Sequence, residues 1–136
     1  MKEIFVEIIT PSKSAYKGEV ISITVPGTLG NFQVLFNHAP LMSSLEIGKI
    51  QIEDATGQHI EFATSGGSIE VRDNKILILA DSVESAEEID VERARKALER
   101  AKERLANRDK GDIDIMRAEF ALNRAINRIK FTGASY

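Results

Sequence analysis

The sequence of 136 residues contains no cysteine and no tryptophan, and it has only two histidines and three prolines. Without cysteine the chain can form neither disulfides nor thiolate-based catalytic or zinc sites. No apolar run approaches the roughly 20 residues that span a bilayer, and the start lacks the charged-then-apolar pattern of a secretory signal. We therefore expect a protein that stays where it is made and meets a membrane only through a partner.

Charges of the two signs nearly balance, with 18 Lys and Arg against 21 Asp and Glu and a net charge of −3. Such a balance argues against a nucleic-acid partner. Acidic residues predominate before residue 87. Residues 87–136 are densely charged with both signs and contain almost no glycine and no proline. This change of composition predicts two domains, residues 1–86 and residues 87–136.

Apolar and polar residues alternate through much of the first domain, which is typical of strands with one buried face. Turn-forming sequences such as Gly66-Gly67 and Asp73-Asn74 separate these alternating runs. Many short β-branched strands in succession predict an antiparallel β-sandwich or barrel. The clearest runs are Ile4, Val6 and Ile8; Ile21, Ile23 and Val25; Ile50 and Ile52; Ile60 and Phe62; Ile69 and Val71; and Ile76 and Ile78.

Residues 91–105 and 115–129 repeat apolar side chains at intervals of three and four, the period of an amphipathic helix. The polar segment 107–111 suits the turn of an antiparallel helix pair. In that pairing the two stripes meet along their length, for example at Leu98 and Leu122. Because the stripes are narrow and rich in alanine, the hairpin is expected to be marginally stable on its own. The predicted fold class is therefore α+β, a sandwich followed by a two-helix hairpin.

The expected N-cap of the first helix is Asp90, with Ser85 followed by Glu88 as an alternative start one turn earlier. Asp112 or Asp114 can cap the second helix. Asp109 accompanies them, but the segment lacks the glycine and the closing glutamate of a calcium loop.

Neither histidine, His38 in a loop or His59 near a strand, belongs to a recognisable catalytic motif. A single loop histidine is more often structural than catalytic. The sequence therefore predicts no catalytic residue, no metal site and no enzyme.

Three arginines share one face of the second helix: Arg117, Arg124 and Arg128. The hairpin pairing places the last two across from the first turns of the first helix, near Asp90 and Arg93. Guanidinium groups bind phosphate oxygens bidentately, so the cluster could be a nucleotide or polyphosphate site. It could equally be a network of salt bridges to Asp90 and Glu87 that holds the hairpin together.

Several motifs in these segments resemble those of epsilon subunits of F-type ATP synthases. Residues 89–94, IDVERA, resemble the I-D-x-x-R-A motif of the family's hairpin, and residues 117–128 resemble its R-A-x-x-A-L-x-R-A-x-x-R helix. Residues 38–41 are similar to its H-A-P-L loop. Residues 65–71, followed by 76–80, are similar to its S-G-G-x-x-E-V and I-L-A strands. The agreement extends in order from residue 3 to near residue 130.

The resemblance implies a ten-stranded antiparallel β-sandwich followed by an antiparallel helical hairpin, in a non-catalytic subunit of the central stalk. It implies that the sandwich couples the gamma subunit to the membrane ring of c subunits during proton-driven synthesis. The hairpin would close on the sandwich, or extend to the alpha/beta catalytic head and inhibit ATP hydrolysis. The implied location is peripheral, at the cytoplasmic face of a bacterial membrane.

No cofactor is required in this family, but some members bind ATP as a regulatory ligand in the closed form. By position, the residues that the resemblance assigns to ATP are Glu84, Asp90, Arg93, Arg124 and Arg128. Two alternatives remain beside the rotor subunit: a free-standing nucleotide sensor, and a sandwich and coiled-coil adaptor whose arginines form only salt bridges.

One loop departs from the family pattern G-E-F/L-G-x-L-P-G-H. Here Asn31 stands at the acidic position, and Phe36-Asn37 stand where the family has Pro-Gly. The loop is expected to face the ring and gamma, so Asn31, Phe36 and His38 are candidate partner contacts. An exposed Phe36 would supply an apolar contact.

Overall fold

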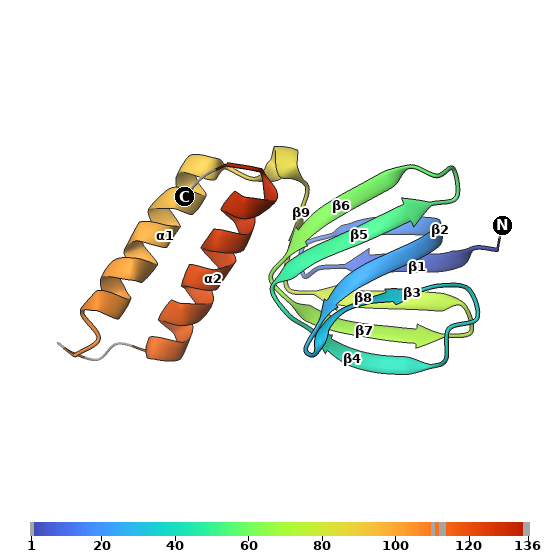
Figure 1. Ribbon diagram of the computed structural model, residues 1–136, viewed down its shortest axis with the longest axis horizontal. Helices are drawn as coiled ribbons and strands as arrows, with labels where there is room; N and C mark the ends of the chain where they lie inside the picture. Colours follow the sequence, from blue (N-terminus) through green and yellow to red (C-terminus); the bar gives the residue numbers. More distant parts are fainter. Residues whose placement is uncertain (1, 110, 112–113, 135–136) are drawn as a thin grey trace. The chain divides into compact units, whose positions relative to one another are not determined.

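A computed structural model describes residues 2–109, 111 and 114–134, which form nine strands followed by two α-helices (Figure 1). The chain divides between Ser85 and Ala86 into two compact units, a sandwich and a helical hairpin. The strands are β1 (Ile4–Ile9), β2 (Ser14–Gly27), β3 (Gly30–Val34), β4 (Leu41–Leu45), β5 (Gly48–Asp54), β6 (His59–Thr64), β7 (Gly67–Arg72), β8 (Lys75–Ala80) and β9 (Val83–Glu84). The helices are α1 (Val91–Ala106) and α2 (Ile115–Phe131), preceded by a 3₁₀ turn at Ala86–Glu88.

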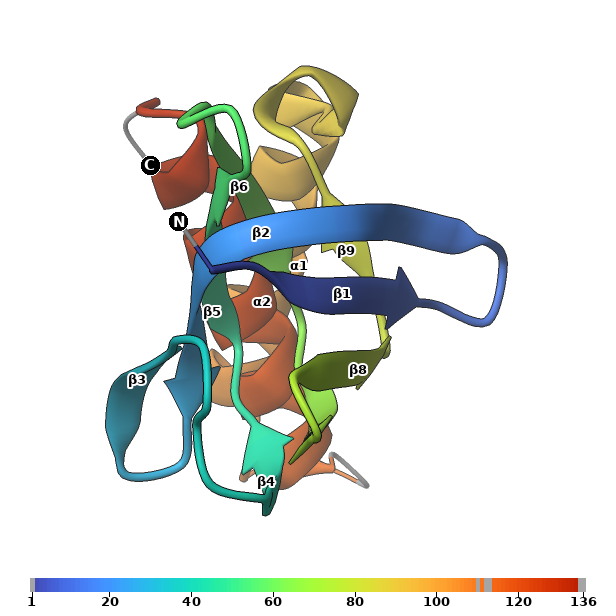
Figure 2. The same cartoon turned by 90° about the vertical axis from the view of Figure 1, so that its right-hand side faces the viewer.

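The sandwich consists of two groups of strands joined by the long strand β2 (Figure 2). In one group β4, β7, β8 and β1 are hydrogen-bonded in that order, and β1 continues onto the first part of β2. The rest of β2 pairs with β5, which is followed by β6 and β9, and its last residues pair with β3.

Two features of this topology differ from the expectation. Nine strands are described where the resemblance implied ten, and the count depends on β2, a single strand of 14 residues that serves both groups. The pairing of β1 with β8 is parallel, whereas the other pairings of the described strands are antiparallel. Strands that are distant in sequence can pair in either direction, so local alternation does not fix this choice.

The predicted alternating residues form the core between the two groups, with Val6, Ile8 and Ile78 fully buried. Ile21 is the exception. The register of β2 against β5 shifts between Val20 and Ser22, so Val20 is buried with Ile23 while Ile21 is only half-buried. An extra residue in one strand of a pair reverses the alternation of side chains beyond it.

The turn between β7 and β8 also anchors the preceding loop. Its two residues, Asp73 and Asn74, have φ values of 51° and 59°, as a tight two-residue hairpin turn requires. Asn74 accepts a hydrogen bond from the backbone N–H of Asn37 (2.6 Å) and donates one to the Asn37 side-chain oxygen (3.2 Å). Asn37 itself has a φ of 65°, a conformation that asparagine tolerates better than most residues. The pair therefore fixes the loop that departs from the family pattern.

The turn between β5 and β6 is closed by a carboxylate. Oδ1 of Asp54 accepts hydrogen bonds from the hydroxyl and backbone N–H of Thr56 and from the backbone N–H of Gln58 (2.6 to 2.9 Å). These donors favour the charged carboxylate, and they hold the pKa of Asp54 below its ordinary value, with the Thr56 hydroxyl as the largest cause.

Both helices begin at an aspartate. Asp90 is the N-cap of α1 and accepts a hydrogen bond from the backbone N–H of Arg93 (3.1 Å), as predicted. Asp114 caps α2 in the same way, through the N–H of Arg117 (3.0 Å). The alternative start at Ser85 is only the isolated 3₁₀ turn, and Asp112 lies outside the described residues.

The two helices pack along the predicted antiparallel stripes. Ala94 and Leu98 of α1 are buried in one cluster with Ala125 and Ile129 of α2, and Leu122 packs against it. This cluster is the hairpin core. Its members are few and two are alanines, so little apolar area holds the helices together. Of the helices described, none combines the length and the apolar character needed to cross a bilayer.

Candidate interaction sites

Four of the five residues assigned to ATP lie in the hairpin: Asp90, Arg93, Arg124 and Arg128. Ala94 shares the hairpin core with Ala125 and Ile129, and each of these residues directly follows an arginine in the sequence. Arg93, Arg124 and Arg128 therefore lie at one end of the helix pair, where α1 begins and α2 ends (Figure 1). The structure thus brings the first turn of α1 and the last turns of α2 together, as the pairing predicted.

The two acidic residues that were expected to pair with these arginines are Asp90 and Glu87. The Asp90 carboxylate is used as a helix cap, and neither it nor Glu87 forms an ion pair with any residue that the structure describes. Glu92 pairs instead with Arg95 along α1 (2.7 Å). Arg128 nevertheless has an interaction partner, so a salt-bridge network remains an alternative to a nucleotide site. Arg93 and Arg124 are exposed, and Arg128 is half-buried.

The fifth residue, Glu84, belongs to the sandwich unit. It is half-buried in β9, where it pairs with Ala63 of β6.

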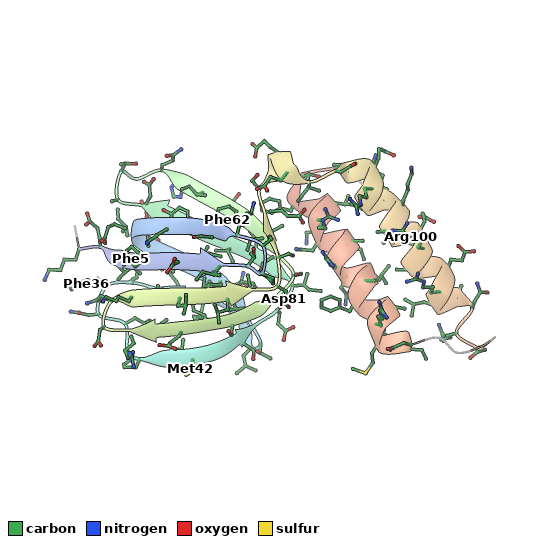
Figure 3. All side chains as sticks on the ribbon, turned by 180° about the vertical axis from the view of Figure 1, so that it is seen from behind. Phe5, Phe36, Met42, Phe62, Asp81 and Arg100 are labelled. Atoms are coloured by element: carbon green, nitrogen blue, oxygen red, sulfur yellow. The ribbon has the colours of Figure 1, made fainter. Side chains whose placement is uncertain are left out.

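The structure corrects the expectation for Phe36. Its side chain is half-buried and packs against the sandwich core, and the Lys2 ammonium lies 5.0 Å from the centre of its ring (Figure 3). Because the core takes up part of the ring, Phe36 is not freely exposed as was expected, and its role as a partner contact stays a prediction. His38 is half-buried, with its Nδ1 2.7 Å from the Ala39 carbonyl, and Asn31 is exposed at the start of β3.

A second surface lies on the outward side of β4, β7, β8 and β1. Met42 and Leu79 are exposed there by 78% and 49%, and Phe5 and Leu77 are half-buried. We call these four residues the outer apolar face. Met42 projects from β4 at the surface of the sandwich (Figure 3).

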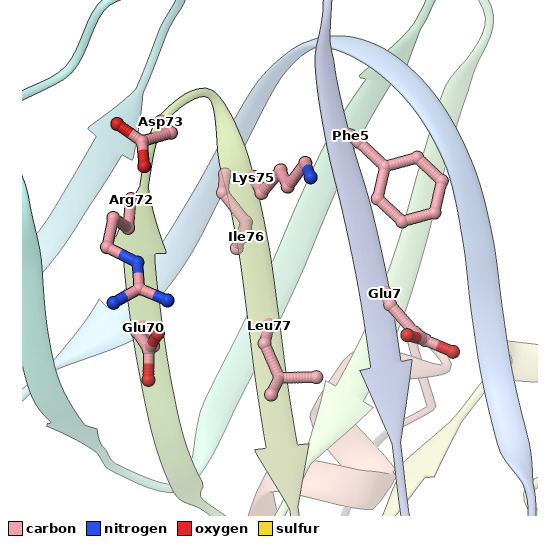
Figure 4. Close-up of a pocket in the computed structure, with 8 residues that line it drawn as sticks. All are labelled: Phe5, Glu7, Glu70, Arg72, Asp73, Lys75, Ile76 and Leu77. Atoms are coloured by element: carbon pink, nitrogen blue, oxygen red, sulfur yellow. The ribbon is translucent and has the colours of Figure 1, made fainter.

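Two open depressions cross this face. One has a volume of about 300 Å³ and extends over β7, β8 and β1 (Figure 4), and the other, of about 370 Å³, extends over β4, β7 and β8. Glu70 and Leu77 line both, so the two depressions meet at this point.

The predictions from sequence did not include this face, although a signal for it was present. Residues 76–79, Ile-Leu-Ile-Leu, form an unbroken apolar run in a strand whose alternate residues, Ile76 and Ile78, were assigned to the core. Leu77 and Leu79 must then point outward, and a strand that is apolar on both faces is typical of a sheet covered on both sides.

Within the part of the chain that the structure describes, no three His, Asp or Glu side chains gather closely enough to hold a metal ion. A small sandwich with an exposed apolar face, followed by a helix pair, is typical of a protein that binds other subunits. Residues 3–86 match the family described as ATP synthase, Delta/Epsilon chain, beta-sandwich domain, and residues 87–133 match its long alpha-helix domain. The chain belongs to the ATP synthase delta/epsilon chain family, whose epsilon chain is a non-catalytic subunit.

Curated relatives agree over nearly the whole length. The chain is 43% identical to the ATP synthase epsilon chain of Desulforamulus reducens, over 91% of this chain and 92% of the relative. It is 46% identical to that of Desulfitobacterium hafniense strain Y51, over 90% of each chain, and 42% identical to that of Moorella thermoacetica, over 98% and 99%. The resemblance drawn from the motifs is confirmed.

Solved structures share the fold. A chain of the Euglena gracilis mitochondrial ATP synthase, solved as OSCP/F1/c-ring, aligns with a TM-score of 0.77 at 24% identity, over 92% of this chain and 78% of that one. A chain of the Tetrahymena thermophila mitochondrial ATP synthase, solved as central stalk/c-ring, gives 0.63 at 18% identity, over 96% and 97%. The sandwich followed by two helices, the predicted fold class, is confirmed.

Proposed function

We propose that this chain is the epsilon subunit of a rotary ATP synthase, where the sandwich joins the gamma subunit to the c-ring and the hairpin regulates ATP hydrolysis. The observation that carries the proposal is the match to both domains of one family, in order, over residues 3–133. The solved structures of similar fold come from assemblies that contain the F1 part, the central stalk and the c-ring. In this role the chain is peripheral, at the cytoplasmic face of a bacterial membrane, and contacts the alpha/beta head when the hairpin extends.

The outer apolar face supports a protein partner on the sandwich. Exposed aliphatic side chains grouped over adjacent strands are typical of interaction sites, and burying one stabilises a complex by about 1.5–3 kcal/mol at most. We assign this face to gamma, and the loop that holds Asn31, Phe36 and His38 to the ring and gamma.

Replacing Met42 and Leu79 together by serine is expected to weaken binding to the isolated gamma subunit by roughly 10- to 100-fold, because two aliphatic contacts are lost. Isothermal titration of the full chain with gamma measures this. The control carries Gln51→Ser and Glu53→Ser on the outward side of β5. If both double variants bind gamma as the wild type does, gamma docks elsewhere; if the wild type does not bind gamma at all, the rotor assignment fails.

A regulatory nucleotide site is a second candidate function, favoured by Arg93, Arg124 and Arg128 at one end of the hairpin. Glu84, Asp90, Arg93, Arg124 and Arg128 are the residues proposed to contact ATP. A polyphosphate that touches both helices stabilises the paired hairpin, and it can shift the equilibrium only by its difference in affinity for the paired and separated forms.

Amide hydrogen exchange tests this second function. ATP at millimolar concentration is expected to increase the protection of residues 91–131 in the wild type and in Arg104→Ala, whose arginine lies at the other end of α1. Arg124→Ala is expected to abolish the increase. Equal responses in both variants, or none in the wild type, would reduce the cluster to a structural role. Tight ATP binding without a gamma complex would favour a free-standing sensor, and the absence of both would favour an adaptor.

A further inference from the structure

We propose that the partner segment on the outer apolar face carries a lysine or arginine among aliphatic residues, and that Glu7 and Glu70 bind this cation. The inference rests on the proposed function, because it specifies the chemistry of the contact with gamma.

The two carboxylates flank one apolar residue at the centre of the face. Leu77 of β8 pairs with Glu70 of β7 on one side and with Glu7 of β1 on the other. Paired residues of adjacent strands project from the same side of a sheet, so all three side chains line the same depression (Figure 4). Strands are about 4.8 Å apart, which puts the backbones of Glu7 and Glu70 roughly 10 Å apart, within reach of one long basic side chain.

Both carboxylates are already partly removed from water, and neither forms an ion pair within the described residues. Each glutamate is half-buried, and neither has a hydrogen bond or an ion pair within the described residues. Lys17 of β2 lies opposite Glu7, and Arg72 and Lys75 line the same depression, but none of these three cations forms an ion pair with either glutamate. Solvent is therefore the main hydrogen-bonding partner of both carboxylates in the chain by itself.

A wholly apolar partner does not fit this arrangement. Covering Met42, Leu77 and Leu79 would also cover the two glutamates, and burying a carboxylate without a partner opposes binding strongly. A lysine or arginine in the covering segment removes this penalty. Arginine is especially suitable, because its guanidinium group can donate two hydrogen bonds to one carboxylate.

The neighbouring charges give the contact a direction. Arg72 and Lys75 pair with each other next to the Asp73-Asn74 turn, one alternation along the strands from Glu70 and Leu77. The face therefore presents two basic residues on β7 and β8 near the turn, and two acidic residues on β7 and β1 one alternation further from it. A partner segment that carries its cation over Leu77 and an acidic or neutral residue over Lys75 is selected, and the reverse orientation is disfavoured.

The test titrates the isolated gamma subunit with the full chain carrying Glu7→Gln and Glu70→Gln, at low and at high salt. Glutamine keeps the size of each side chain, so the sandwich is retained, which circular dichroism verifies. The variant is expected to bind gamma about 10-fold or more weakly at low salt, with a reduced dependence on salt. The control is Glu53→Gln, a half-buried glutamate on the outward side of β5.

Unchanged or tighter binding by the double glutamine variant would overturn the inference. If the Met42 and Leu79 serine variant loses affinity in the same titration while the glutamine variant does not, only the charge assignment fails. If the wild type itself does not bind gamma, the proposed function fails, and this inference fails with it.

Discussion

Replacing Gly67 with alanine is expected to lower the free energy of unfolding of the sandwich by about 3 kcal/mol or more. Gly67 has a φ of 148° and lies where β4 and β8 meet at β7, paired with both Leu45 and Ala80. A Cβ atom at this position would lie 2.1 Å from the Leu79 carbonyl oxygen and 2.8 Å from the Ala80 Cα. Both neighbours are backbone atoms of a paired strand, so the clash is relieved only by separating β7 from β8.

The matched control is Gly57→Ala in the β5–β6 turn. Gly57 also has a positive φ, of 88°, but a Cβ there meets nothing within 4 Å. The Gly57→Ala substitution should therefore lower the free energy of unfolding only by the strain of a left-handed backbone, about 1–2 kcal/mol. Urea unfolding, followed by the amide exchange of β7 and β8, measures both variants. Equal losses would show that the sheet accommodates the methyl group and that the close backbone approach is unimportant.

Replacing Ile129 with aspartate is expected to separate the two helices of the hairpin. Ile129 is fully buried in the hairpin core with Ala94, Leu98 and Ala125. An aspartate there either buries a charge at a cost of several kcal/mol or opens the interface. Since the hairpin core is narrow, and isolated helices of this length are marginal, opening is the expected result.

The measurement is hydrogen exchange across the full chain. Protection is expected to disappear over residues 91–131, with a loss of helical circular dichroism, while the strands stay protected. Met116→Asp in the same helix is the control, because Met116 is 82% exposed and an acidic residue near a helix N-terminus is tolerated. Retained helix protection in Ile129→Asp would mean that the hairpin does not depend on this core.

The predictable parts of the structure were those set by neighbouring residues. The period of the apolar residues identified strands before residue 87 and helices after it, and the turn at Asp73-Asn74 and the cap at Asp90 follow from local hydrogen bonding and φ preferences. The pairing of α1 with α2 could also be predicted from the sequence, because the short connection makes the helices antiparallel and the two apolar stripes then match along their length. The cluster of Arg93, Arg124 and Arg128 followed from that register.

The errors occurred where distant segments meet. The burial of Val20 in place of Ile21 depends on a register shift against β5, and the half-burial of Phe36 depends on its packing against the sandwich core. No local pattern at Phe36 distinguishes a ring that packs inward from one that is exposed. The hydrogen bonds between Asn37 and Asn74 likewise join residues from separate turns.

The sequence by itself thus determined the two-part architecture, the family and the arginine end of the hairpin, because period, caps and motifs are encoded in residues close together along the chain. Only the tertiary structure decided that Glu7 and Glu70 flank Leu77 on an apolar face. That arrangement requires β1 to lie parallel beside β8 while β7 lies antiparallel on its other side. Strand order and direction are fixed by burial of the whole core, which no single segment contains.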